Sequence, residues 1–160
     1  RRRQEYPSRR SNPLTEAPMR TVRQLLADKP AEVFAVAPEA PVVEAIRLMA
    51  DKSIGAVLVL RGEALAGILS ERDYARKVVL QGRSSADTPA SAIMTAQVVT
   101  VGPDTPVTAC MQLMTERRIR HLPVVEGGQV VGVISIGDLV KAGSADQQLE
   151  LEQLQRYIAG

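Results

Sequence analysis

The chain of 160 residues is 45% hydrophobic and 24% charged with a net charge of +2, which is ordinary for a globular protein with its own core. No stretch approaches the roughly 18 apolar residues of a membrane-spanning helix, so we expect no membrane partner. One cysteine and one histidine exclude an internal disulfide and a Cys/His zinc site within a single chain. The lone Cys110 and the lack of an apolar signal-peptide core favour a cytoplasmic location.

The net charge conceals a basic amino-terminal segment. Residues 1–23 hold seven arginines against two glutamates, a charge of +5, which leaves −3 for the rest of the chain. Residues 1–20 combine proline, serine and charge without apolar periodicity, so they are predicted to be a disordered tail. A solvated tail is the main interpretation, and electrostatic contact with nucleic acid is the alternative.

The first predicted elements are a short helix capped by Thr21 and a strand over residues 33–36. A second helix begins at Pro41, where the missing N–H of proline costs nothing, and its apolar residues recur at helical spacing through Met49. Residues 56–60 are continuously apolar, which is typical of a strand buried on both faces.

The chain then turns back on itself. A turn at Gly62 leads into a second strand of a hairpin over residues 65–69. Ser70 starts a helix that is predicted over residues 71–80. The polar segment that follows, residues 81–91, is a connector.

The stretch from residue 33 to residue 77 recurs without a gap 65 positions later. Identities fall on the proline before the first helix, the glycine of the hairpin turn and the Ser-x-x-Asp before the last helix. In the second copy, Gly127 and Gly128 supply the positive φ angles of a tight turn. A repeat of this kind indicates two equivalent units, each too small to stand alone, packed as a pseudo-twofold pair with two related clefts between them.

The predicted organisation therefore has five parts. They are a basic tail (1–20), a first repeat (21–80), a connector (81–91), a second repeat (92–143) and a carboxy-terminal helix (144–160). Two interpretations stay open for the last helix, namely packing on its own domain and contact with a second copy of the chain.

These features resemble a tandem pair of cystathionine β-synthase (CBS) domains, a Bateman module, of the stand-alone bacterial type. The resemblance covers residues 21–142. It lies in the β-α-β-β-α order, the Pro-x-x-Pro-Val opening of each first helix, the Gly-hydrophobic-hydrophobic-Ser-x-x-Asp before each second helix, and Arg-His-Leu-Pro-Val in the second copy. It implies an α/β (α+β) fold in which two β-α-β-β-α repeats, small mixed three-stranded sheets with helices, pack with pseudo-twofold symmetry.

The resemblance also implies a function. Such modules bind adenosine-containing ligands, here AMP, ADP, ATP or NAD(H), and signal through changes in conformation or in contacts with a protein partner, which is unknown. They commonly form homodimers, so we expect a homodimer. The alternative hypothesis is a non-catalytic interaction scaffold with vestigial clefts that acts through the Arg-rich tail, with nucleic acid as its partner.

The two aspartates of the repeated motif, Asp73 and Asp138, carry the clearest chemistry. A carboxylate accepts two hydrogen bonds, which matches the adjacent hydroxyls of a ribose, and the resemblance implies this role. It places Ser70 and Ser135 near ribose or phosphate. The same Ser-x-x-acid pattern is also a helix capping box, so a purely structural role stays open.

The second copy carries a basic cluster that the first copy lacks. By the resemblance, Arg120 and His121 align with the family's basic phosphate-binding pair and Arg118 with a basic position just before them, and arginine pairs bidentately with phosphate. A hydrogen-bonded core position is the alternative for His121. In the first copy, Gly55 and Ala56 stand at the positions of Arg120 and His121, so we expect two unequal sites. The basic second copy suits AMP or ADP, and the roomier first copy a dinucleotide.

The resemblance further implies that adenine lies between apolar residues of the first strand and the hairpin of each copy. Plain core packing is the alternative for these apolar residues. Arg72, which stands beside the first aspartate, is also a predicted nucleotide-binding residue. The remaining ones are Val33, Phe34, Ile54, Val98, Val99, Thr100, Ile119 and Pro123.

No catalytic constellation is recognised. Ser70 and Ser135 lack a histidine base at a matching position in both copies, and the single histidine does not make a triad. No Gly-x-x-x-x-Gly-Lys-Ser loop is present for phosphoryl transfer. We therefore predict a protein that is not an enzyme.

Overall fold

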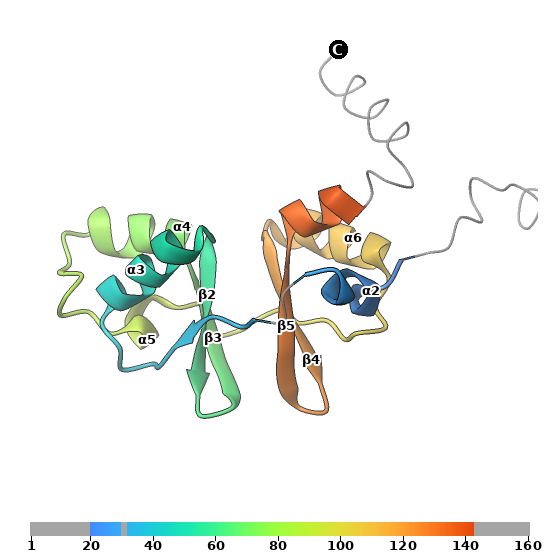
Figure 1. Cartoon of the computed structure of the whole chain (residues 1–160). Helices are drawn as coiled ribbons and strands as arrows, with labels where there is room; N and C mark the ends of the chain where they lie inside the picture. Colours follow the sequence, from blue (N-terminus) through green and yellow to red (C-terminus); the bar gives the residue numbers. More distant parts are fainter. Residues whose placement is uncertain (1–19, 30–31, 143–160) are drawn as a thin grey trace, which may run out of the picture.

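A computed structural model describes residues 20–29 and 32–142 of the chain (Figure 1). The predicted basic tail, apart from Arg20, and the predicted helix over residues 144–160 lie outside the described residues. Among the helices of these two described ranges, none has both the length and the apolar character to cross a bilayer.

The first half is built on a three-stranded sheet in the order β1-β2-β3. Strand β1 (Ala35–Val36) pairs in parallel with β2 (Ala56–Arg61), which forms an antiparallel hairpin with β3 (Ala64–Ser70). Helix α3 (Val42–Lys52) follows Pro41, as predicted, and links the two parallel strands. Its buried face contributes to a core on β2.

The helix after Ser70 is less regular than predicted. It consists of α4 (Glu71–Tyr74) and the π-helical turn η1 (Ala75–Val79), in which the N–H of Leu80 donates to the carbonyl of Ala75 at 3.0 Å. A single α-helix over residues 71–80 was expected. A π turn contains one residue more than an α turn, and the pattern of apolar residues over only ten positions is too short to reveal this difference.

The second half repeats this arrangement with one strand fewer. Helix α6 (Val107–Arg117) leads to the antiparallel hairpin of β4 (His121–Glu126) and β5 (Gln129–Ser135), and residues 136–142 are helical. The strand expected before α6 is reduced to one parallel bridge between Val101 and Val124. Its counterpart β1 is only two residues long, so losing one pair turns a short strand into a bridge. The fold class is otherwise as predicted.

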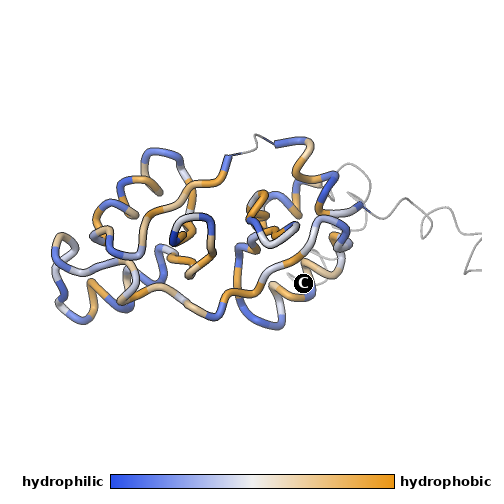
Figure 2. The backbone as a smooth tube through the Cα atoms, turned by 90° about the horizontal axis from the view of Figure 1, so that it is seen from below, coloured by the Kyte–Doolittle hydropathy of each residue, from blue (hydrophilic) through white to orange (hydrophobic). Residues whose placement is uncertain are grey.

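The hairpin turns agree with the sequence. Gly62 has φ +64° in the first hairpin, and Gly127 and Gly128 have φ +62° and +80° in the second. These angles lie in the left-handed region that only glycine enters without cost. Seen from below, the two halves lie side by side, and apolar stretches recur in both (Figure 2).

A short helix ahead of each of the repeated segments 33–77 and 98–142 packs on the opposite half (Figure 1). Helix α2 (Val22–Ala27) contributes Val22 and Leu25 to the core of the second half, whereas α5 (Ala90–Ile93) contributes both its buried residues to the core of the first half. The two halves therefore exchange their leading helices, and neither core is complete without the other half.

A repeated glycine makes room for each exchanged helix. A Cβ atom at Gly67 would lie 2.5 Å from Met94 Sδ, and one at Gly132 would lie 2.6 Å from Leu26 Cδ2. Both distances are shorter than a van der Waals contact. At Gly67 the Cβ would also lie 2.9 Å from the backbone carbonyl oxygen of Thr95, so the backbone would have to move, whereas at Gly132 the Leu26 side chain would have to shift. Close packing therefore explains why both copies have glycine in the second strand of the hairpin.

Candidate functional site

Two cavities of about 500 Å³ each lie between the halves, within the size range of small-molecule sites. We call them the Asp138 cleft and the Asp73 cleft after the aspartate that lines each. Both are also lined by His121 and by the small residues Gly55 and Ala56, so the two cavities meet at this point.

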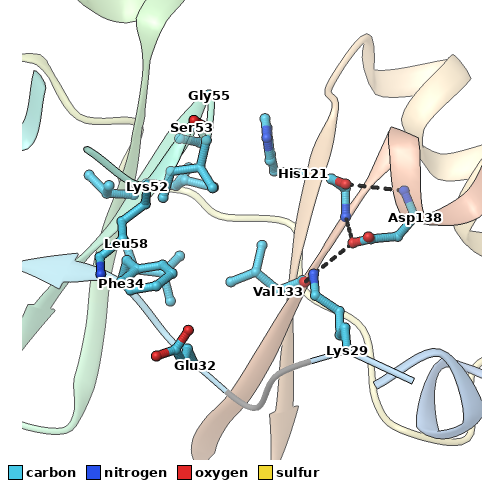
Figure 3. Close-up of a pocket in the computed structure, with 15 residues that line it drawn as sticks. Lys29, Glu32, Phe34, Lys52, Ser53, Gly55, Leu58, His121, Val133 and Asp138 are labelled. Carbon is cyan, nitrogen blue, oxygen red and sulfur yellow. Dashed lines mark hydrogen bonds and ion pairs between the residues drawn. The ribbon is translucent and has the colours of Figure 1, made fainter. Parts of the chain in front are cut away.

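The Asp138 cleft combines residues from both halves (Figure 3). Phe34 and Ile54, which flank the strands β1 and β2, form apolar surface from the first half. Ser135 and Asp138 come from the end of β5 and the helix that follows it. Between them, Val133 points from β5 toward the ring of Phe34 (Figure 3).

The Asp73 cleft is the reverse combination. Its aspartate comes from the first half with Ser70 and Arg72, and most of its apolar residues come from the second half. These second-half residues are Val98, Val99 and Ile119, and Arg118 and Arg120 lie with them, whereas Ala56 and Ile68 belong to the first half.

Each cleft thus takes its aspartate from one copy and most of its apolar wall from the other. The sequence left it open which of the two sites Arg118 and Arg120 serve, and the structure places both in the cleft of Asp73. A constant offset reveals which residues are equivalent, but it does not reveal which copy supplies the facing wall.

Both aspartates form the capping boxes that the sequence left open. The N–H of Asp73 donates to Ser70 Oγ at 3.1 Å, and the N–H of Ser70 donates to Asp73 Oδ2 at 2.9 Å. The corresponding distances between Asp138 and Ser135 are 3.2 and 2.8 Å. The cap therefore holds each carboxylate in place at the edge of its cleft, so the structural role and a ligand-binding role are compatible.

The aspartates differ in their cationic partners. Lys29 Nζ donates to Asp138 Oδ2 at 2.7 Å and to the carbonyl of Val133 at 2.9 Å (Figure 3). Burial raises the pKa of Asp138, but the hydrogen bonds from Lys29 and Ser135 outweigh it, so the pKa lies below its ordinary value. Asp73 instead pairs with Lys77, one turn along its own helix, at 3.2 Å.

His121 lies where the two clefts meet, and its ring points toward Gly55 (Figure 3). A Cβ atom at Gly55 would be 3.6 Å from His121 Cε1, so the glycine leaves the imidazole its space. Burial lowers the pKa of His121 below its ordinary value, and this effect exceeds the opposing influence of the Asp138 carboxylate. Burial therefore favours the neutral imidazole, in which one ring nitrogen donates a hydrogen bond and the other accepts one.

Three predicted residues do not line either cleft, namely Val33, Thr100 and Pro123. Pro123 is buried in β4, and its carbonyl accepts a hydrogen bond from Val101 at 3.0 Å. Thr100 is exposed. Val33 is half-buried and directly precedes Phe34, which does line the Asp138 cleft.

The structure also adds lining residues that the sequence analysis missed. Lys29 and Gln97 are the clearest pair, because Leu26 and Met94 pack on the two equivalent glycines and are 68 positions apart. The same offset of 68 aligns Lys29 with Gln97. This alignment was hidden because the repeat was compared at a constant offset of 65. The other missed residues are Glu32, Lys52, Ser53, Val57, Leu58, Ile68, Glu71, Thr95 and Val133.

Comparison with known proteins identifies related chains. The model of the CBS domain matches twice, over residues 20–80 and 90–145. The mitochondrial CBS domain-containing protein CBSX3 of Arabidopsis thaliana is 46% identical over 124 residues. That match covers 74% of this chain and 60% of the Arabidopsis protein, so the chain spans less than two thirds of this relative.

Two solved structures share the fold. One is described as a signal-transduction protein with CBS domains from Burkholderia ambifaria MC40-6. It is 54% identical with a TM-score of 0.77, and the match covers 80% of this chain and 96% of that protein. The other is a CBS domain protein of Pyrobaculum aerophilum complexed with AMP. It is 29% identical with a TM-score of 0.66, and the match covers 74% and 88% of the two chains.

Proposed function

Because the chain belongs to the CBS domain family, as a tandem pair of CBS domains, we propose that it is a regulatory module that binds adenosine-containing ligands. The observation that carries the proposal is the placement of Asp73 and Asp138, each held by a capping box beside a cavity whose facing wall is apolar. A ribose donates two hydrogen bonds to such a carboxylate, and a purine packs against apolar side chains. The AMP bound to the Pyrobaculum relative supports this class of ligand.

In this proposal the Asp73 cleft is the main site for a nucleotide that carries phosphates. Arg72, Arg118 and Arg120 line it, and Arg118 is held in the left-handed conformation (φ +55°) at the end of α6. Three guanidinium groups around one cleft favour a phosphate over a neutral group. AMP, ADP and ATP are the first candidates. NAD(H) is a further candidate, because Gly55 and Ala56 leave space where the two clefts meet.

The output of the module is proposed to be a change of shape or of partner contacts rather than catalysis. A ligand that contacts both halves at once favours the arrangement in which its two walls are correctly spaced. The name of the Burkholderia relative supports a signalling role.

Two further parts of the proposal concern assembly and compartment. We propose a homodimer that forms through the exposed faces of α3 and α6, where Met111 is 38% exposed, and gel filtration tests it. A reducing compartment, the cytoplasm, fits the full burial of Cys110, whose thiol pKa is raised by that burial. Cell fractionation tests this placement, since the Arabidopsis relative is named as mitochondrial.

Calorimetric titration of the full chain with AMP, ATP and NAD(H) tests the function. We expect AMP to bind, and Asp73→Asn to weaken that binding about tenfold, because a carboxylate that accepts two ribose hydroxyls becomes a neutral amide. The asparagine oxygen still accepts the N–H of Ser70, so the unfolding temperature should change little.

Asp87→Asn is the matched control, because it removes an exposed carboxylate outside both clefts. Its affinity for AMP should equal that of the unaltered chain. The absence of binding at millimolar concentrations of all three ligands would exclude the proposed function.

A further inference from the structure

Lys29 lies inside the Asp138 cleft and holds the carboxylate that the proposed function assigns to ribose. Its ammonium donates to Asp138 Oδ2 and to the carbonyl of Val133 (Figure 3). The N–H of Ser135 donates to the same Oδ2 atom at 2.8 Å, so this oxygen already accepts two hydrogen bonds. The side chains of Lys29 and Asp138 are only 32% and 26% exposed, so this ion pair is less screened than a surface pair.

The Asp73 cleft is built differently at the equivalent position. Gln97 lines that cleft where Lys29 lines the other, and it carries no charge. The cationic partner of Asp73 is Lys77, which is not among the residues that line the cleft. Lys77 also donates to the carbonyl of Ile93 at 3.0 Å. The partner of Asp73 therefore stands outside its cleft, whereas the partner of Asp138 stands within.

This difference has a consequence for any ligand that uses Asp138. A ribose with two hydroxyls needs both carboxylate oxygens, so it must share Oδ2 with the ammonium or displace it. A displaced ammonium that is two-thirds buried is left without its anion, which is unfavourable. A phosphate on the same ligand replaces that anion and forms charge-assisted hydrogen bonds with the lysine, whereas a neutral nucleoside does not.

We propose that Lys29 determines the specificity of the Asp138 cleft and makes it select phosphorylated nucleosides over neutral nucleosides. This inference rests on the proposed function, since it concerns the ligand of the same cleft. This effect differs from general electrostatic attraction. The preference arises because the ribose takes the Asp138 carboxylate away from Lys29, and a phosphate on the ligand then replaces that carboxylate. Lys52 lines the same cleft, but its ammonium lies over the ring of Phe34, 5.2 Å from the centroid.

The test is a site-resolved titration of the full chain with adenosine and with AMP, followed by NMR of valine methyl groups. Val133 lines only the Asp138 cleft and Val98 only the Asp73 cleft, so their signals report the two affinities separately. We expect AMP to bind more tightly than adenosine at Val133. Lys29→Gln, which copies the residue of the other cleft, should reduce this preference about tenfold at Val133, corresponding to one charge-assisted hydrogen bond. The preference at Val98 should not change.

Two further variants complete the design. Lys52→Gln removes the same charge from the same cleft without freeing Asp138, so it should leave most of the preference intact. Lys29→Arg keeps a cation beside Asp138 and should retain the preference.

Several outcomes would overturn the inference. Equal losses in Lys29→Gln and Lys52→Gln would mean that only the total charge matters. An unchanged preference in Lys29→Gln, with a lower unfolding temperature, would make the lysine a structural tether. Binding with an unchanged preference overturns this inference alone, whereas no shift at either valine with either ligand overturns the proposed function as well.

Discussion

At the scale of single residues, His121 illustrates how one side chain takes its properties from both halves. Four charged groups act on its imidazole. The carboxylates of Asp138 and Glu71 raise its pKa, and the cations of Arg120 and Lys29 lower it, but burial has the largest effect and lowers it. Glu71 belongs to the first half and Asp138 to the second, so the protonation of His121 depends on how the halves meet.

This environment predicts an acid-side loss of stability. The pKa of His121 is lower in the folded chain than in the unfolded chain, so the unfolded chain binds the proton first as the pH falls. The free energy of unfolding should therefore decrease as the pH drops below about 6.5, the ordinary pKa of histidine, and down to the folded pKa. Urea titrations between pH 7.5 and 5.5 on the unaltered chain and on His121→Gln measure this contribution.

The control lies in the difference between the two curves, because all other groups titrate alike in both proteins. His121→Gln should lose less stability over this pH range. Parallel curves would show that the histidine has the same pKa in the folded and the unfolded chain.

At the scale of elements, the exchange of leading helices decides which residues share a core. Helix α2 precedes the repeated segment 33–77 in the sequence, but Val22 and Leu25 pack with Val124 and the rest of the second core. Helix α5 makes the converse exchange into the core that contains Val59. Sequence neighbours are therefore poor guides to packing neighbours at both helices.

A double-mutant cycle tests this exchange. Leu25→Ala should lower the free energy of unfolding by about 2–4 kcal/mol, because Leu25 is 6% exposed in the second core. Combined with Val124→Ala, it should show a coupling of at least about 0.5 kcal/mol, since the two residues share one cluster. Urea unfolding of the single and double variants supplies the four free energies.

The matched control uses the repeat-equivalent valine of the first half. Val59 is fully buried like Val124, but it belongs to the other core. Leu25→Ala and Val59→Ala should be additive to within about 0.5 kcal/mol, as distant sites are. Coupling to Val59 in place of Val124 would contradict the observed packing.

At the scale of the whole molecule, the exchanged helices make the two halves one folding unit. If either half unfolds, it withdraws a helix from the core of the other half. The hairpins also meet, since β3 and β5 are in contact where the clefts lie between the halves. Ligand binding between the halves and stability of each half are therefore linked properties.

This linkage predicts a single cooperative transition. Unfolding in urea should give the same midpoint for the methyl signals of Val59 in the first core and Val124 in the second, and for the helical circular dichroism. Separate midpoints for the two valines would mean that each half holds its core without the exchanged helix.

Much of the fold and part of the candidate site are predictable because they depend on local rules. Proline before a helix, glycine in a turn and serine with aspartate in a capping box act over a few residues, and the structure shows each of them in both copies. The repeat then identifies equivalent positions, so most of the predicted site residues do line one of the two clefts.

The sequence by itself thus determined most of the helices and strands, the two repeated units and the capping boxes of the repeated aspartates. Only the tertiary structure decided which copy supplies the facing wall of each cleft. It also decided that Arg118 and Arg120 line the cleft of Asp73 and that Lys29 forms an ion pair with Asp138. The physical reason is that these contacts join residues up to 109 positions apart, and they exist only because the two halves exchange helices and pack against each other. No periodicity or spacing along the chain encodes that packing.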